Sequence, residues 1–172
     1  MKIKNLLLEH KPIILKKWFD LILDTYPSDT SDFLKRQNST SFNPVSQIIY
    51  EGIEGLYDGL INDIHTDNVR AHIDSIVRVR AVQDFTASGA LNFIFLLKKL
   101  IRTELEQDIR EHDLFEELLA IESDIDGLVS IAFDIYMACR EKLYDLKANE
   151  MRNWTYRVVK NSKAYREVKA EE

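Results

Sequence analysis

The chain has 172 residues, a formal net charge of -6 and one cysteine, Cys139. This length fits a single domain whose core is large enough to fold unaided, and the acidic balance disfavours general binding to nucleic acid. One cysteine excludes an intramolecular disulfide framework, and Cys139 is expected to be a buried core thiol. Because Asn92, Ser130 and Asp134 interrupt the longest apolar runs, we expect no membrane span and a cytoplasmic protein.

Helical periodicity dominates the first half of the chain. Pro12 is expected to open the first helix, because proline is favoured in a first turn, and Tyr26-Pro27 to end it. After a polar connection, Asn43-Pro44 has the form of a helix cap followed by a first-turn proline. Apolar residues then recur at helical spacing to about Asn62.

Three glycines, Gly52, Gly55 and Gly59, lie three and four apart on that helix. Such a strip favours close packing of another helix, and contact with a flat ligand is the alternative. Asp67 is predicted to cap the next helix. Thr86 or Ser88 is predicted to cap the one after it, which would run to about Gln107.

The last sixty residues predict one long helical region. Apolar residues step by four and three from Leu114 to Cys139, and the segment 128–139 is apolar nearly all round, so it is expected in the centre of the domain. After Leu146 only a narrow heptad stripe is apolar, which is typical of a helix that pairs with a partner helix. We therefore predict a helical sensor domain over 1–148 and a coiled-coil-like extension over 149–172. The residues predicted to form a homodimer interface are Met151, Trp154, Val158, Asn161 and Tyr165.

Polar side chains crowd one predicted helix junction. Arg78, Arg80, Gln83 and Asp84 precede an apolar run, and Asn92 lies within that run. Buried charge is costly unless it is paired, so the cluster indicates either a polar network or a ligand site. We expect Asp84 to pair with one arginine and, since residues two apart on a helix point in different directions, only one arginine to face inward.

A ligand cavity between the Asn43–Asn62 helix and the Ile76–Arg102 segment is a related hypothesis. Tyr50, Gln83 and Asn92 would then supply a few polar contacts in a mostly apolar pocket. Packing that leaves no void is the competing interpretation, since protein interiors rarely contain large cavities.

Catalytic and metal motifs are not evident in the sequence. Neither a phosphate-binding glycine loop nor a nucleophile elbow occurs, and the four histidines lack metal-ligand spacing, so we expect no enzyme and no metal site. His72 precedes the last long helices, where a globin holds its haem ligand, which makes haem or tetrapyrrole binding an alternative function. The interleaved bases and aromatics of 152–169 could contact single-stranded nucleic acid, but a coiled-coil outer face is the simpler account.

Several segments resemble one family. LLLEHKPIILKKWFDLILDTYP, FNPVSQIIYEGIEGLYDGL, IVRVRAVQDFTASGALNFIFLLKKLIR and FDIYMACREKLYDLKANEMRNWTYRVV are similar to the N-terminal domain of RsbRD-type proteins, the RsbT co-antagonists of the bacterial stressosome. The resemblance implies an all-α, globin-like sensory bundle without haem, whose long C-terminal helix continues as a stalk toward a STAS domain or a kinase. Since the sequence stops at Glu172, we expect a stand-alone sensor that dimerises and binds a small ligand or a partner protein in stress signalling.

Overall fold

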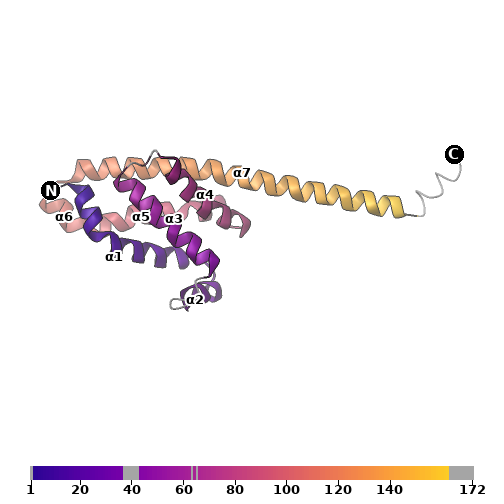
Figure 1. Cartoon of the computed structure of the whole chain (residues 1–172), viewed down its shortest axis with the longest axis horizontal. Helices are drawn as coiled ribbons and strands as arrows, with labels where there is room; N and C mark the ends of the chain where they lie inside the picture. Colours follow the sequence, from indigo (N-terminus) through magenta and orange to yellow (C-terminus); the bar gives the residue numbers. More distant parts are fainter. Residues whose placement is uncertain (1, 37–42, 63, 65, 163–172) are drawn as a thin grey trace.

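The computed structural model describes residues 2–36, 43–62, 64 and 66–162, and this part of the chain contains seven α-helices and no strand (Figure 1). The prediction of an all-α bundle with a long C-terminal helix is confirmed. The helices are α1 (Ile3–Leu23), α2 (Ser28–Arg36), α3 (Pro44–Ile61), α4 (Asp67–Val82), α5 (Ala87–Glu104), α6 (Glu106–Glu111) and α7 (Phe115–Asn161).

Five of the helices enclose the core. α3 packs on α4, α4 and α5 pack on α7, and α1 packs on both α5 and α3. Two aromatic side chains form hydrogen bonds between these helices. The indole of Trp18 donates to the Phe93 carbonyl at 2.7 Å, and the Tyr57 hydroxyl donates to the Leu7 carbonyl at 2.9 Å. Both bonds satisfy the polar end of a buried ring.

The first helix begins nine residues before the proline that was expected to open it. α1 starts at Ile3, and Pro12 lies inside the helix. The expectation was wrong because Ile3, Leu6 and Leu7 are buried in the core, and their burial extends the helix toward the N-terminus. Pro12 faces solvent, so the carbonyl that loses its helical donor lies on the exposed side.

Side-chain caps fix the starts of the central helices. The Asn43 side chain accepts from the Val45 amide at 2.8 Å, as predicted for α3, and Thr86 caps α5 by accepting from the Gly89 amide at 3.2 Å. The α4 cap is Thr66 rather than Asp67, which occupies the first turn. An acidic residue there also complements the helix dipole, so both positions suit a helix start.

The glycine strip of α3 is the contact surface for α4. A Cβ atom added to Gly52, Gly55 or Gly59 would meet a side chain of Ile76, His72 or Val69 at 2.6, 2.2 and 2.2 Å. The side chains of α4 therefore occupy the notches that the glycines leave, which is the close-packing interpretation.

α7 is buried on one side only. Leu128, Ala132 and Ile135 face the core, whereas Phe133 and Met137 are 47% and 40% exposed. The expectation that 128–139 lies in the centre of the domain was wrong, because four helices cover one face of α7 and none in the described part covers the other. Cys139 is half-buried against the core.

Beyond the bundle α7 continues alone as a stalk, which we define as residues 144–161 (Figure 1). Every stalk residue is exposed, and the helix crosses the predicted domain boundary at residue 148 without a break. Tyr165 lies outside the described residues.

Candidate functional site

The candidate site is built on the α4–α5 turn, residues 83–86. α4 ends at Val82, and Asp84 adopts a positive φ of 60°, a conformation that aspartate tolerates better than most residues. The amide of Phe85 then donates back to the Arg80 carbonyl at 3.3 Å, which closes the helix end. The turn thus places the last turn of α4 beside the first turn of α5.

Arg80 is completely buried beneath this turn. Its Nη2 donates to the Thr25 hydroxyl at 2.9 Å and to the Gly89 carbonyl at 3.0 Å. Its guanidinium carbon lies 4.1 Å from the centre of the Phe85 ring and 5.3 Å from that of Tyr26. Two aromatic rings, these two neutral oxygens and the hydroxyl of Tyr26, which also interacts with the guanidinium, therefore surround the cation.

The charge of Arg80 has no acidic partner among the described residues. Its Nε and Nη1 atoms are buried and make no hydrogen bond there. Desolvation by burial lowers the pKa of Arg80 below its ordinary value. Arginine nevertheless stays protonated in proteins, so the site holds a positive charge.

A surface hollow of about 620 Å³ lies beside the buried cation. The Tyr26 hydroxyl donates to Gln83 Oε1 at 3.0 Å, and the Tyr26 ring meets Phe85 edge-on at 5.1 Å between centres. Burial raises the pKa of Tyr26, and the charge of Arg80 partly opposes that rise. The hollow is lined by Thr25, Tyr26, Pro27, Thr30, Gln83, Asp84 and Phe85.

Three hydrogen bonds connect the end of α4 and the α4–α5 turn to α7. The Tyr136 hydroxyl donates to the Phe85 carbonyl at 2.7 Å, and Arg140 Nη1 donates to the Ala81 carbonyl and to Asp84 Oδ1, both at 3.2 Å. Arg140 also donates to the Tyr144 hydroxyl at 3.0 Å, at the base of the stalk. Tyr136 and Arg140 were not among the predicted site residues, although their four-residue spacing on one helix face with Tyr144 was an available signal.

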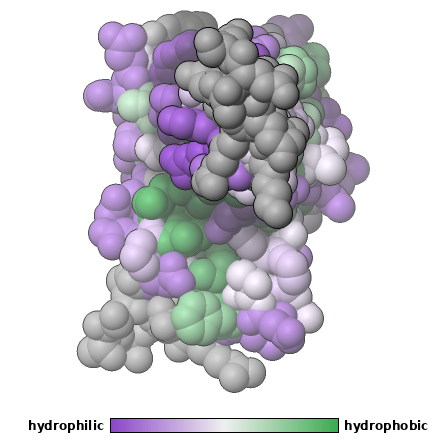
Figure 2. All heavy atoms as spheres, turned by 90° about the vertical axis from the view of Figure 1, so that its right-hand side faces the viewer, coloured by the Kyte–Doolittle hydropathy of each residue, from purple (hydrophilic) through white to green (hydrophobic). Residues whose placement is uncertain are grey.

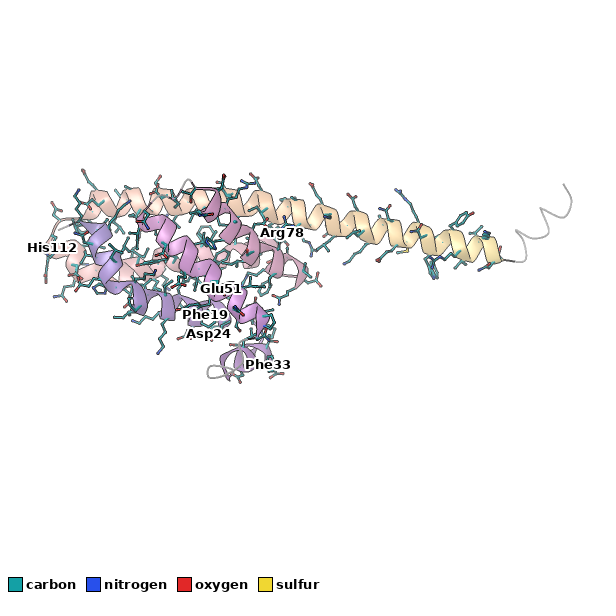
Figure 3. The ribbon with its side chains drawn as sticks, viewed as in Figure 1. Phe19, Asp24, Phe33, Glu51, Arg78 and His112 are labelled. Atoms are coloured by element: carbon teal, nitrogen blue, oxygen red, sulfur yellow. The ribbon has the colours of Figure 1, made fainter. Side chains whose placement is uncertain are left out.

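The predicted network of Arg78, Arg80 and Asp84 does not form, because the three side chains have different partners. Only one of the two arginines faces inward, as expected. Arg80 is buried, whereas Arg78 is exposed and pairs with Asp74 at 2.5 Å. The expectation that Asp84 pairs with one of these arginines was wrong, because its partner is Arg140. Figure 3 labels Arg78 in the part of the bundle toward the stalk and His112 at the opposite end.

The other predicted site residues lie elsewhere. Tyr50 is on α3 and meets Phe19 edge-on at 5.5 Å, and Asn92 is half-buried on α5. Met151, Trp154 and Val158 are exposed on the stalk by 65%, 64% and 49%. Asn161, at the end of α7, is also exposed.

The described residues contain neither a candidate metal cluster nor a helix that could span a membrane. They contain no group of three or more His, Cys, Asp or Glu side chains that could hold a metal ion. None of their helices is both long enough and apolar enough to span a bilayer.

Comparison with protein-family models gives a match over most of the chain. The family model described as the RsbT co-antagonist protein rsbRD N-terminal domain matches residues 12–151, which include most of the bundle, the α4–α5 turn and the start of the stalk. Neither the curated proteins nor the solved structures contain a significant match.

Proposed function

Because the chain belongs to the RsbRD N-terminal domain family, a family of stressosome-related regulatory domains, we propose that it is a sensory domain that dimerises through the stalk and responds to a small ligand or a partner protein. The proposal assigns no catalytic step and no resident cofactor to the chain, and it places the protein in the cytoplasm. A signalling kinase or a STAS-type protein is the partner class that would receive its output.

The observation that carries the proposal is the continuity of α7. One helix of 47 residues packs against the core through its first half, passes the α4–α5 turn and continues into the stalk. Tyr136 and Arg140 bind the turn to α7 through Phe85 and Asp84. A change in the turn would therefore alter the helix that leaves the bundle.

Exposed apolar side chains on the stalk support dimerisation. Met151, Trp154 and Val158 are spaced three and four apart, which is the seam of a two-stranded coiled coil. Asn161 follows at the next position of the seam, where a polar residue sets register. An isolated helix of this length gains most of its stability by packing an apolar face, and a second copy supplies that face.

Two neighbouring valines test the dimer. Val158 and Val159 are 49% and 50% exposed, but only Val158 lies on the seam. Val158→Glu should convert the dimer to a monomer at micromolar concentration, because it places like charges opposite each other in the seam, whereas Val159→Glu should leave the dimer intact. Light scattering on both variants and the parent chain measures this. A monomeric parent, or equal effects of the two variants, would refute the proposed interface.

Haem binding through His72 is the alternative function. It requires the imidazole to face a cavity that accommodates a macrocycle. The His72 ring instead packs over Gly55, and the hollow beside it has about 290 Å³, at the lower limit for a ligand pocket. A strong Soret band from the purified protein would reverse this order of preference.

A further inference from the structure

Arg80 differs from the other buried ion of the bundle. Glu122 is also buried, but Arg102 makes two hydrogen bonds to its carboxylate and the Lys98 ammonium lies 4.0 Å away. Arg80 is more deeply buried and has no carboxylate partner in the described part of the chain. Burial of a cation and of unpaired N–H groups is costly, so a residue kept in this state indicates a function other than stability.

The buried guanidinium lies one layer of side chains from the surface hollow. Thr25, Tyr26 and Phe85 each contact Arg80 and also line the hollow. Arg80 itself does not line the hollow, so a ligand there would reach the buried Nε and Nη1 donors only after one of these shared side chains moves. Figure 2 views the side from which α7 projects, and apolar surface gathers in the middle of that face, below α7.

The chemistry of the surroundings defines the ligand class. Guanidinium N–H groups pair best with the oxygens of a carboxylate or another oxyanion. The rings of Tyr26 and Phe85, with Pro27, give the hollow apolar walls suited to an apolar ligand body. Its volume of about 620 Å³ is within the range of small-molecule sites. Asp84, paired with Arg140, lies at the rim, and its repulsion of a bound anion grows with the charge of that anion, which favours a monoanion over a multiply charged phosphate.

We propose that Arg80 binds the carboxylate of a small organic monoacid whose apolar part occupies the hollow between the α1–α2 connection and the α4–α5 turn. The inference deepens the proposed sensory function, because it names the ligand class and the residue that recognises it. Binding changes the contacts of Phe85, whose carbonyl accepts from Tyr136, and the turn transmits the change to α7.

The test compares two arginines on the same helix. Arg80→Met replaces the buried cation with an apolar side chain of similar length and should fold, since exchanging a buried ion for an apolar group is often neutral or stabilising. Arg78→Met removes the exposed arginine two positions earlier and is the matched control. The full-length parent and both variants are titrated with acetate, hexanoate and benzoate, with benzamide as the neutral analogue of benzoate and inorganic phosphate as the alternative anion.

Two readouts report binding. The side-chain Nε–H signal of Arg80, assigned by its loss in Arg80→Met, should shift with hexanoate or benzoate in a ¹H–¹⁵N NMR spectrum, and the melting temperature should rise. Arg78→Met should respond like the parent. Arg80→Met should show no rise in melting temperature and should bind the acids at least about tenfold more weakly than the parent. Benzamide should have no effect.

Several outcomes would overturn the proposal. No response to any of the three acids at about 10 mM, ten times a millimolar Kd, would exclude an accessible carboxylate site. An equal response to benzamide would show that the ligand's charge is not recognised. A response to phosphate alone would reassign the site to inorganic oxyanions. Binding retained by Arg80→Met would exclude Arg80 as the binding residue. Light scattering on the same samples separates the two proposals, since loss of acid binding with an intact dimer leaves the stalk interface standing.

Discussion

Arg78 and Arg80 lie two positions apart on α4 and occupy opposite environments. Arg78 is exposed and its pair with Asp74 contributes under about 1 kcal/mol. Arg80 is buried against two aromatic rings, where its charge is little screened. At this scale, a rotation of about 200° around the helix axis separates a solvated side chain from a candidate recognition residue.

Tyr57 gives a prediction about stability at alkaline pH. Burial, and secondarily the nearby Asp58 charge, raises the pKa of Tyr57 above its ordinary value of 10.0. The unfolded chain therefore loses this proton near pH 10.0 while the folded chain keeps it, so the free energy of unfolding should fall as pH rises above that value. Tyr57→Phe should cost about 1 kcal/mol at neutral pH, through the lost bond to Leu7, and should make the alkaline fall shallower.

Urea denaturation at neutral pH and above pH 10.0 measures both effects. Tyr156→Phe is the control, because Tyr156 is 64% exposed and its loss should change neither the stability nor the slope. The same alkaline slope in the parent and in Tyr57→Phe would show that burial of Tyr57 does not raise its pKa.

At the scale of helices, the α3–α4 contact depends on the absence of side chains. Gly59 receives a methyl group of Val69, and Gly55 receives the ring of His72. A valine is stiff at its first dihedral angle, so Val69 has little freedom to move away, whereas an imidazole can swing aside. Gly59 is therefore the more demanding position of the strip.

Two glycine substitutions should change the stability of the protein in opposite directions. Gly59→Ala should destabilise the protein by about 1–3 kcal/mol, because the new methyl would overlap Val69. Gly127→Ala, on the exposed side of α7 with nothing within 4 Å of the added Cβ, should stabilise it by about 0.5–1 kcal/mol through helix propensity. Thermal melts of the two variants measure the difference. Stabilisation of both would mean that α3 and α4 are not in close contact at Gly59.

At the scale of the whole molecule, α7 combines two roles. Its first half closes the core with Leu128, Ala132 and Ile135, and its second half extends into solvent as the stalk. The α4–α5 turn contacts α7 near the boundary between these two halves, through Tyr136 and Arg140. A bundle with this connection is suited to sending a local change along one helix.

Truncation after Leu146 tests the separation of the two roles. The shortened chain should keep its cooperative melt, because every core residue of α7 precedes the cut, and should lose most of its dimerisation. Circular dichroism and light scattering on the truncated chain measure the two properties. A dimer that survives truncation would place the interface on the bundle, where Phe133 and Met137 are exposed.

Local patterns in the sequence were sufficient to predict most of the helices and several of their ends. Asn43 and Thr86 cap their helices with side-chain bonds to amides two and three residues away, so near neighbours suffice to predict them. The stripe of Met151, Trp154 and Val158 is likewise a property of one helix. The polar cluster before α5 was also evident from the sequence alone.

Only the tertiary structure decided how those residues are used. Asp84 pairs with Arg140, 56 residues further along the chain, and Thr25 at the end of α1 contacts Arg80. Pro12 lies inside α1 because upstream residues are buried, and Phe133 is exposed because the bundle covers one face of α7. The spacing of residues along a helix fixes which side chains share a face, but the packing of separate helices decides which face is buried and which charges meet.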